Sequence, residues 1–267
     1  MSEISSVEKS FAIITGASSG IGEAYAHKLA EKGFSLILTA RRKDRLNKTA
    51  ADLKKKYKTE TIIIQADLSS EKGIDTVLKK IKPVKNIEFF VHAAGFGTRG
   101  YFADIADYKI KGMAILHNLA AISIAREVLP SMIKRNKGFL VFVSSLGAFF
   151  TTKEYVMYSA TKAFLNMFVL GLDAEIIKTG VIVQALCPGL TKTEFLSTPE
   201  YKDFNYEQIP EFAWMTAQQV VEDSMKNLKK NNPIFIPGIM NRLFVSILES
   251  PVFGTFIKYI LGKATSW

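Results

Sequence analysis

The sequence predicts a doubly wound α/β fold, in which a parallel sheet of about seven strands carries helices on both faces. Two observations point to it. Short apolar runs rich in β-branched residues alternate with segments of helical spacing, and each run is short enough for a strand buried on both faces. A cluster of glycines also follows the first run directly and precedes a helical pattern. Such an alternation implies right-handed crossovers between parallel strands.

Seven apolar runs predict the strands of this sheet. They span residues 11–15, 35–39, 61–65, 87–91, 138–143, 181–186 and 232–238. Helical spacing is found in residues 21–33, 44–57, 70–81 and 108–136. Residues 190–215 are rich in aromatic, proline and polar side chains, and long excursions of this kind are uncommon unless they bind something. We expect them to form a substrate-binding lid, followed by a last strand and an apolar C-terminal segment at about 238–267.

Residues 1–267 are expected to form a single domain, because a chain of this length with 48% hydrophobic residues can bury one large core. The single cysteine excludes an internal disulfide, and the N-terminal residues show no secretory signal, so we predict a cytoplasmic protein. The apolar C-terminal run is interrupted by Glu249, Pro251 and Lys258 and makes a poor membrane span. No transmembrane segment is predicted, while peripheral contact with a membrane surface stays open.

The net charge of +10 raises the question of a nucleic-acid partner. Residues 41–58 alone carry nine basic and two acidic side chains, so most of the excess lies in one predicted helix, whose lysines are interpreted as a solvated face. No nucleic-acid partner is therefore predicted. The three histidines are scattered, without the spacing of metal ligands, and no metal site is predicted.

The first predicted strand ends in TGASSGIG, residues 15–22. Gly16, Gly20 and Gly22 allow a tight turn and a close approach of the backbone to a pyrophosphate, whose charge would lie at the positive N-terminus of the next helix. The spacing G-x-x-x-G-x-G differs from the standard G-x-G-x-x-G fingerprint. Its place between the first strand and the first helix nevertheless predicts a dinucleotide site in a Rossmann fold.

The end of the second predicted strand bears on the choice of dinucleotide. A carboxylate there accepts hydrogen bonds from the ribose 2′-hydroxyl of NAD, whereas an arginine there pairs with the 2′-phosphate of NADP. The chain has Arg41 and Arg42 at this place and no acidic residue. Arg41 is therefore the candidate for the 2′-phosphate, with Arg42 and Ser18 nearby. NADP(H) is the preferred cofactor; the alternative, that both arginines are ordinary surface charges, leaves NAD(H) open.

Tyr158 and Lys162 lie four residues apart in YSATK, which on a helix places them on one face. A free tyrosine has a pKa of roughly 10. A neighbouring ammonium favours the phenolate, so Lys162 is expected to lower the pKa of Tyr158 and to make it a usable proton donor and acceptor. Such a pair alone is more often structural. Ser145, at the end of the fifth strand, and Asn118, a polar residue in a mostly apolar helix, favour a catalytic interpretation.

With these residues the chain resembles the short-chain dehydrogenase/reductase family over nearly its whole length. The matching pieces are TGASSGIG at 15–22, Asp67-Leu68, HAAG at 92–95, Asn118, Ser145, YSATK at 158–162 and CPGLTKT at 187–193. The resemblance implies an oxidoreductase that transfers hydride between a nicotinamide and a carbonyl or alcohol carbon.

The resemblance also implies a role for each position. Tyr158 would be the catalytic acid or base, Ser145 would hold the carbonyl oxygen, and Lys162 would bind the nicotinamide ribose. Asn118 would order a water that links Lys162 to solvent. The implied cofactor-binding positions are Tyr158, Lys162, Gly16, Ser18, Ser19, Gly20, Ile21, Gly22, Arg41, Arg42, Asp67, Leu68, Ala94, Gly95, Pro188, Gly189, Thr191 and Thr193.

One departure from the family pattern follows the fourth strand. The family usually has Asn-Asn-Ala-Gly there, and this chain has His92 and Ala93 in place of the two asparagines. Because those asparagines mainly tie neighbouring strands together, the substitution bears on local stability more than on chemistry. We interpret His92 as a hydrogen-bonded core histidine and not as a catalytic base.

Apolar and aromatic side chains are expected to line the substrate pocket. They are Leu146, Phe149, Phe150, Tyr155, Leu190, Phe195, Phe204, Phe212 and Trp214. The C-terminal part resembles the branch that contains DltE-like bacterial oxidoreductases and 3-ketoacyl reductases, which implies a hydrophobic or acyl ketone or aldehyde. Family members usually pair through the helices that are here 108–136 and 155–179, which implies a homodimer or homotetramer.

Two other functions stay open at this point. One is an NAD(P)-dependent alcohol or hydroxysteroid dehydrogenase that works oxidatively. The other is a non-catalytic dinucleotide-binding protein, as some relatives that lost the tyrosine or lysine are. The intact set of Asn118, Ser145, Tyr158 and Lys162 argues against the second.

Overall fold

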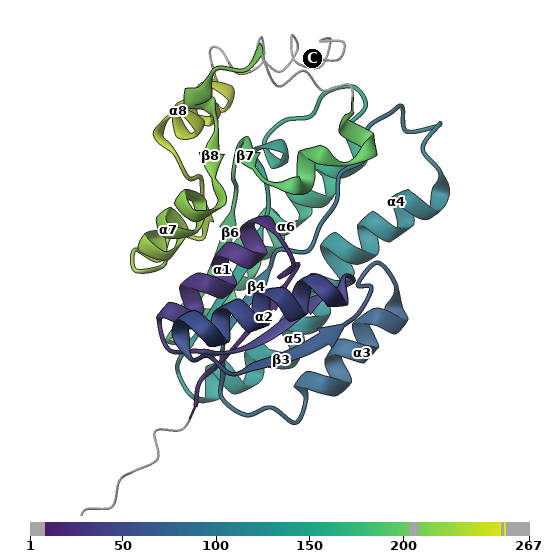
Figure 1. The fold of residues 1–267 in the computed structure, drawn as a ribbon. Coiled ribbons are helices and arrows are strands. Elements are labelled where there is room, and N and C mark those ends of the chain that lie inside the picture. The colour runs from purple at the N-terminus through teal and green to yellow at the C-terminus, as the bar shows by residue number, and fades with distance from the viewer. Residues whose placement is uncertain (1–8, 203–207, 252–253, 255–267) are drawn as a thin grey trace, which may run out of the picture.

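The computed structural model describes residues 9–202, 208–251 and 254, and its main sheet has seven parallel strands in the order β3-β2-β1-β4-β5-β6-β9. The strands are β1 (Phe11–Thr15), β2 (Ser35–Ala40), β3 (Thr61–Gln65), β4 (Ile87–His92), β5 (Gly138–Val143), β6 (Val181–Leu186) and β9 (Ile234–Phe235). Helices lie on both sides of this sheet (Figure 1). The predicted doubly wound fold is confirmed.

Each face of the sheet has its own apolar core, because successive side chains of a strand point to opposite faces. Ile13 and Ile37 belong to the core under α3 (Glu71–Ile81), α5 (Ala120–Lys134) and α6 (Val156–Ile176). Ile14 and Leu38 belong to the core under α1 (Gly20–Glu31), α2 (Lys43–Tyr57) and α7 (Ala217–Leu228). Both faces are therefore buried, which explains why the strands are apolar throughout.

The strand order reverses at β1, which pairs with β2 on one side and with β4 on the other. The loops after β1 and β4 consequently diverge to opposite faces of the sheet. In open parallel sheets, ligands bind in the crevice that such a switch point creates at the carboxyl ends of the strands. The glycine-rich loop and the HAAG segment both lie at this place.

One long helical stretch joins β4 to β5. It consists of α4 (Asp107–Ala114), a π-helical turn η1 (Ile115–Leu119) and α5. By length and composition the stretch 107–134 could cross a membrane, and 44% of its most apolar window is buried inside the fold. Because α5 packs against β4, β5 and α3, its place in the core accounts for its apolar composition.

The predicted lid contains a small second sheet, in which β7 (Thr191–Lys192) pairs with β8 (Met215–Thr216). The described residues between these strands include the short 3₁₀ turns η3 (Glu194–Ser197), η4 (Pro199–Tyr201) and η6 (Glu211–Ala213). The helix α8 (Ile239–Leu248) follows β9. The remainder of the expected C-terminal segment, and Phe204 of the lid, lie largely or wholly outside the described residues.

Candidate active site

Tyr158, Lys162, Ser145 and Asn118 come together at the carboxyl end of β5. Ser145 follows β5 and begins the 3₁₀ turn η2 (Leu146–Ala148), where its hydroxyl hydrogen-bonds to the Tyr158 phenol. Tyr158 and Lys162 lie one turn apart on α6, with the Lys162 ammonium 5.7 Å from the centre of the Tyr158 ring. Asn118, in η1, donates its amide to the Thr161 carbonyl at 2.9 Å. The fold thus brings all four predicted residues together.

Lys162 is held by the end of β5. Its ammonium donates to the Val143 carbonyl at 2.8 Å, while the Ser144 hydroxyl donates to the Lys162 carbonyl at 3.0 Å. The side chain is buried, and this burial lowers the pKa of Lys162 to about 8. At neutral pH Lys162 is therefore still mostly protonated, but it loses its proton at a lower pH than a free lysine does.

The expected lowering of the Tyr158 pKa is wrong for this structure. Burial of the phenol raises the pKa of Tyr158 above its ordinary value, and the hydrogen bond from Ser145 opposes the rise only in part. The Lys162 ammonium does not offset it, because that group is directed to the Val143 carbonyl and the two side chains make no hydrogen bond. Tyr158 is therefore protonated at neutral pH.

The sequence interpretation missed His117, which lies between the loop after β4 and α6. The Phe96 amide donates to its Nε2 at 3.2 Å, so the proton lies on Nδ1, which donates to the Thr161 hydroxyl at 2.8 Å. Thr161 donates in turn to the Tyr158 carbonyl at 2.9 Å. Burial and the nearby Lys162 charge hold the pKa of His117 far below its usual value. A second polar residue beside Asn118 was the signal that could have revealed it.

His92 has the structural role that the sequence predicts for it. Its Nδ1 accepts from the Thr15 hydroxyl at 3.1 Å, and its Nε2 donates to the Leu116 carbonyl at 3.0 Å. The Thr15 oxygen also accepts the amides of Ala93 and Ala94, each at 3.2 Å. These bonds tie β1, β4 and η1 together where the family uses asparagines. Burial lowers the pKa of His92 to about 3, so the ring is neutral.

The glycine-rich loop fits a dinucleotide. Gly16 has a φ of +68°, and a Cβ there would lie 2.8 Å from the Ala93 carbonyl carbon, so only glycine permits this turn. A Cβ on Gly22 would lie 2.3 Å from the Gly16 oxygen, so the start of α1 can approach the loop closely. Ser19 precedes α1 without capping it with its side chain. The amides at this helix start therefore form a cradle of the kind that binds pyrophosphate.

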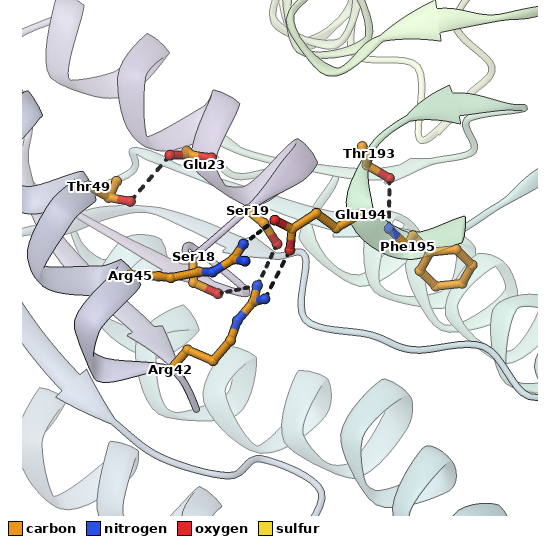
Figure 2. Close-up of polar contacts among 9 residues, drawn as sticks. All are labelled: Ser18, Ser19, Glu23, Arg42, Arg45, Thr49, Thr193, Glu194 and Phe195. Atoms are coloured by element: carbon orange, nitrogen blue, oxygen red, sulfur yellow. Dashed lines mark hydrogen bonds and ion pairs between the residues drawn. The ribbon is translucent and has the colours of Figure 1, made fainter. Parts of the chain in front are cut away.

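Basic side chains gather beside this loop (Figure 2). The Arg42 guanidinium donates to the hydroxyls of Ser18 at 3.2 Å and Ser19 at 3.0 Å. Arg41, the residue expected to lead this site, is exposed, and its backbone carbonyl accepts from Gln65. Arg42, not Arg41, makes the contact with the loop. The last residues of β2 include no acidic residue, and the Glu194 carboxylate of the lid reaches Arg42 from the other side.

The remaining cofactor positions lie around the same crevice. The Asp67 carboxylate accepts from the Ser69 amide at 3.0 Å and the Ser69 hydroxyl at 2.7 Å, whereas the Leu68 side chain is buried in the core. Only the backbone of Leu68 is thus available to an adenine. The other positions, Gly20, Ile21, Ala94, Gly95, Pro188, Gly189, Thr191 and Thr193, border the loops after β1, β4 and β6.

The loop after β6 approaches the glycine-rich loop, and the loop after β4 approaches the Tyr158 cluster. A Cβ on Gly20 would lie 3.1 Å from Thr193, and one on Gly95 would lie 3.0 Å from His117 and 3.7 Å from the Lys162 ammonium. Thr193 also accepts the Phe195 amide at 3.3 Å, which begins η3. These loops therefore place the glycine cradle and the Tyr158 cluster on one continuous path, as a dinucleotide requires.

Aromatic side chains of the lid cover Tyr158. The Phe195 and Tyr158 ring centres lie 5.8 Å apart, and Tyr201 packs against Phe195 at 5.6 Å and against Tyr155 at 6.3 Å. The Tyr201 hydroxyl lies 2.0 Å from where a Cβ of Gly97 would be, so it fills the space above this glycine. The lid was predicted to supply Phe195; the role of Tyr201 was missed.

Other expected pocket residues have different surroundings. Phe150 packs edge-on against Phe244 of α8 at 5.5 Å, and Phe149 packs against the core under α6. Phe212 is 71% exposed and does not line a buried wall. Cys187 is buried, and its pKa is raised to about 12 by that burial, so it is a poor nucleophile. Within the described ranges, no three His, Cys, Asp or Glu side chains gather as metal ligands.

Known proteins resemble this chain in both sequence and structure. A very-long-chain 3-oxoacyl-CoA reductase of Danio rerio is 33% identical over 265 residues, which is 96% of this chain and 80% of that protein. The Bos taurus reductase is 33% identical over 69% of this chain but only 60% of its own length. A human inactive hydroxysteroid dehydrogenase-like protein is 32% identical over 72% of the chain and 58% of its own.

A solved structure agrees with the sequence comparison. A short-chain dehydrogenase from Sphingobium yanoikuyae in complex with NADPH has a TM-score of 0.81 and 26% identity, covering 97% of this chain and 98% of its own. The family model for short chain dehydrogenases matches residues 10–202, from β1 through the turn η4. This match covers the glycine loop and all four clustered side chains, and the protein therefore belongs to the short-chain dehydrogenase family and is an NAD(P)-dependent oxidoreductase that acts on CH-OH or C=O groups.

Proposed function

We propose that this protein is an NADPH-dependent reductase of a hydrophobic ketone or aldehyde, with an acyl compound as the first candidate. The proposal depends on the position of the Tyr158 hydroxyl at the carboxyl end of β5. This hydroxyl is hydrogen-bonded to Ser145, and Tyr158 lies one helical turn from Lys162. Bound NADPH would supply the hydride. The glycine loop and the Arg42 cluster would hold it, as the previous section describes.

Each residue of the cluster has a part in the reduction. Ser145 donates a hydrogen bond to the carbonyl oxygen and so positions it next to the Tyr158 phenol. Tyr158 gives its proton to that oxygen as the carbonyl carbon is reduced. Lys162 would bind the ribose hydroxyls of the bound cofactor, and its ammonium lies 5.7 Å from the centre of the Tyr158 ring. Asn118 fixes η1 against α6 through the Thr161 carbonyl.

The charge state of Tyr158 favours reduction over the oxidative alternative. Its pKa is raised, so the phenol carries its proton at neutral pH and is ready to act as an acid. An alcohol dehydrogenase needs the phenolate as a base, and this form becomes common only at higher pH. The oxidative function is therefore the second candidate for the direction of the reaction, and NAD(H) stays the alternative to NADP(H).

The apolar surroundings of Tyr158 support a hydrophobic substrate. Phe195 packs against the Tyr158 ring, Tyr201 packs against Phe195, and Phe150 packs against Phe244 of α8. The 3-oxoacyl-CoA reductase from Danio rerio, which matches almost the whole chain, makes an acyl substrate with a 3-oxo group the first to try. Pockets of this type bury most of an apolar ligand and use few polar groups.

Assembly and location are proposals as well. We propose a cytoplasmic homodimer or homotetramer that pairs through α5 and α6. The exposed apolar side chains of this surface support it: Ile133, Val156, Phe164, Met167, Leu170 and Ile177. Contact of the C-terminal segment with a membrane also stays a prediction, because residues 252–253 and 255–267 lie outside the described chain.

The first test follows nicotinamide fluorescence while NADPH or NADH is added, and then the oxidation of NADPH with a panel of ketones and 3-oxoacyl thioesters. Replacing Tyr158 with Phe removes the proton donor, so turnover should fall about 100- to 10,000-fold while the NADPH affinity stays within a few-fold. The control is Lys137→Ala, because Lys137 directly precedes β5 and so lies at the opposite end of this strand from the Tyr158 cluster. Undiminished turnover in the Tyr158→Phe variant would refute the acid role.

A further inference from the structure

The Glu194 carboxylate joins the lid to the nucleotide cradle. Glu194, the first residue of η3, forms an ion pair with Arg42 at 2.9 Å and a second ion pair with Arg45 of α2. The same Arg42 guanidinium contacts Ser18 and Ser19 of the glycine-rich loop. Figure 2 shows the carboxylate between the two guanidinium groups, with the serine hydroxyls beside Arg42. Residues 152 positions apart in the sequence thus meet over the nucleotide half of the crevice.

The two ion pairs of Glu194 have close contacts, but their side chains are only half buried. Hydrogen bonds from Arg45 and Arg42 lower the pKa of Glu194, so the carboxylate is ionised at neutral pH. About half of each side chain is exposed: 46% for Arg42 and 47% for both Arg45 and Glu194. Exposed ion pairs contribute little free energy, because water and salt screen them. Another anion can therefore exchange with this carboxylate at small cost.

The anion that would best replace it is a phosphate. Two guanidinium groups and two serine hydroxyls can donate hydrogen bonds to a phosphate. The end of β2 contributes no carboxylate that would repel it. If Glu194 stayed in contact with both arginines, a phosphate and a carboxylate would compete for the same positive charge. Two anions that contact the same guanidinium groups repel one another, so the phosphate would displace the Glu194 carboxylate from the arginines.

We propose that Glu194 competes with the 2′-phosphate of the cofactor for Arg42 and Arg45, and that binding of this phosphate releases the lid from α2. The inference rests on the proposed function, since it assigns the phosphate of NADPH to this cluster. Glu194 is thus a specificity-determining residue: the carboxylate occupies the arginines until a nucleotide with a 2′-phosphate replaces it, whereas a nucleotide without that phosphate leaves it in place.

Release of Glu194 would affect the active site because the next residue in the chain contacts Tyr158. Phe195, the next residue, lies against the Tyr158 ring, and the following turn η4 is held separately by an ion pair between Lys109 and Glu200 at 3.1 Å. Loss of the Glu194 contacts therefore frees η3, which contributes Phe195, and leaves η4 attached.

The experiment compares the binding of adenosine 2′,5′-bisphosphate and of 5′-AMP by calorimetry, so it needs no substrate and no turnover. In Glu194→Gln the competitor is gone, and the bisphosphate should bind about three- to tenfold tighter, which corresponds to two exposed ion pairs. The affinity for 5′-AMP should stay within about twofold. Glu200→Gln removes a second carboxylate of the lid, one that is paired with Lys109, and should leave the ratio of the two affinities unchanged. Combining Glu194→Gln with Arg45→Gln should remove most of the gain.

Hydrogen exchange measures the release of the lid. Without nucleotide, the peptide that covers residues 193–201 should exchange faster in Glu194→Gln than in the wild type. The peptide that contains Lys109, in α4, should exchange at the same rate in both. The inference is overturned if Glu194→Gln binds the bisphosphate no tighter than the wild type, or if exchange of this peptide is the same in both. If the wild type prefers the bisphosphate, such a result leaves the proposed cofactor standing. A wild type that binds neither nucleotide overturns the proposed function and this inference together.

Discussion

At the scale of single residues, the site depends on charges and hydrogen bonds that only the fold brings together. Lys162 shows this most clearly. The spacing of Tyr158 and Lys162 correctly predicts a shared helix face, but burial is the main cause of the pKa shift of both side chains. A sequence pattern gives the neighbours along a helix and not the depth at which they are buried.

Lys162 should make the stability of the protein depend on pH. Its pKa is about 8 in the folded protein and about 10.4 in an unfolded chain. Below pH 8 the folded state bears the full cost of a buried ammonium, and between these values only the unfolded state keeps the proton. The free energy of unfolding of the wild type should therefore rise relative to Lys162→Met, by about 1–3 kcal/mol between pH 7 and pH 10. Urea unfolding at several pH values measures this difference, and a constant difference would contradict the burial argument.

His117 should act as a positioning residue for Tyr158. Replacing it with Leu leaves the Phe96 amide and the Thr161 hydroxyl without their partner, which should lower the free energy of unfolding by about 1–3 kcal/mol and reduce kcat. His117→Gln keeps an acceptor and a donor, so it should restore much of both. If Gln behaves no better than Leu, the hydrogen bonds are unimportant and only the volume of the ring matters.

At the scale of elements, most boundaries follow from the sequence and the exceptions have local causes. The strand predicted at 232–238 is only two residues long, because Pro233 and Pro237 lack the N–H that a strand needs and lie on either side of it. The helix predicted at 108–136 is present but contains the π turn η1, and side-chain periodicity does not reveal one extra residue in a turn. The contacts of His117 with Thr161 and of Glu194 with Arg42 join segments 44 and 152 residues apart, and no local pattern predicts them.

The lid should open when Tyr201, in the turn η4, is displaced. In Gly97→Ala the new methyl group would overlap the Tyr201 hydroxyl, so the Tyr201 ring must move away and take η4 with it. We expect KM for a hydrophobic substrate to rise about three- to tenfold with a smaller change in kcat, since Tyr158 and Ser145 keep their places.

Gly171→Ala is the matched control for this change. Gly171 lies within α6, and a Cβ there meets no atom within 4 Å. The substitution should leave KM unchanged and stabilise the helix by up to about 1 kcal/mol. Equal KM values for Gly97→Ala and Gly171→Ala would show that the position of Tyr201 does not limit substrate binding.

At the scale of the whole molecule, the exposed apolar side chains of α6 should govern assembly. Met167 is 70% exposed in the single chain, in the middle of this helix. Met167→Lys places a charge where two α6 helices would meet, so the oligomer should dissociate to monomers at micromolar concentration. Met240→Lys on α8, where the side chain is 51% exposed, should leave the oligomer intact. Light scattering after size-exclusion chromatography measures both, and a wild type that is monomeric at all concentrations would rule out the proposed pairing.

The two borders of the main sheet also bear on how this protein avoids unwanted polymers. A border strand with a long row of unpaired amides and carbonyls is a template on which another chain can add a strand. At one border, β9 contributes only Ile234 and Phe235, between two prolines, so an added chain would gain very few ladder bonds there. The sheet therefore has one short, proline-flanked margin that resists growth of fibrils, and any such growth would have to begin at β3, where Ile62 is 40% exposed.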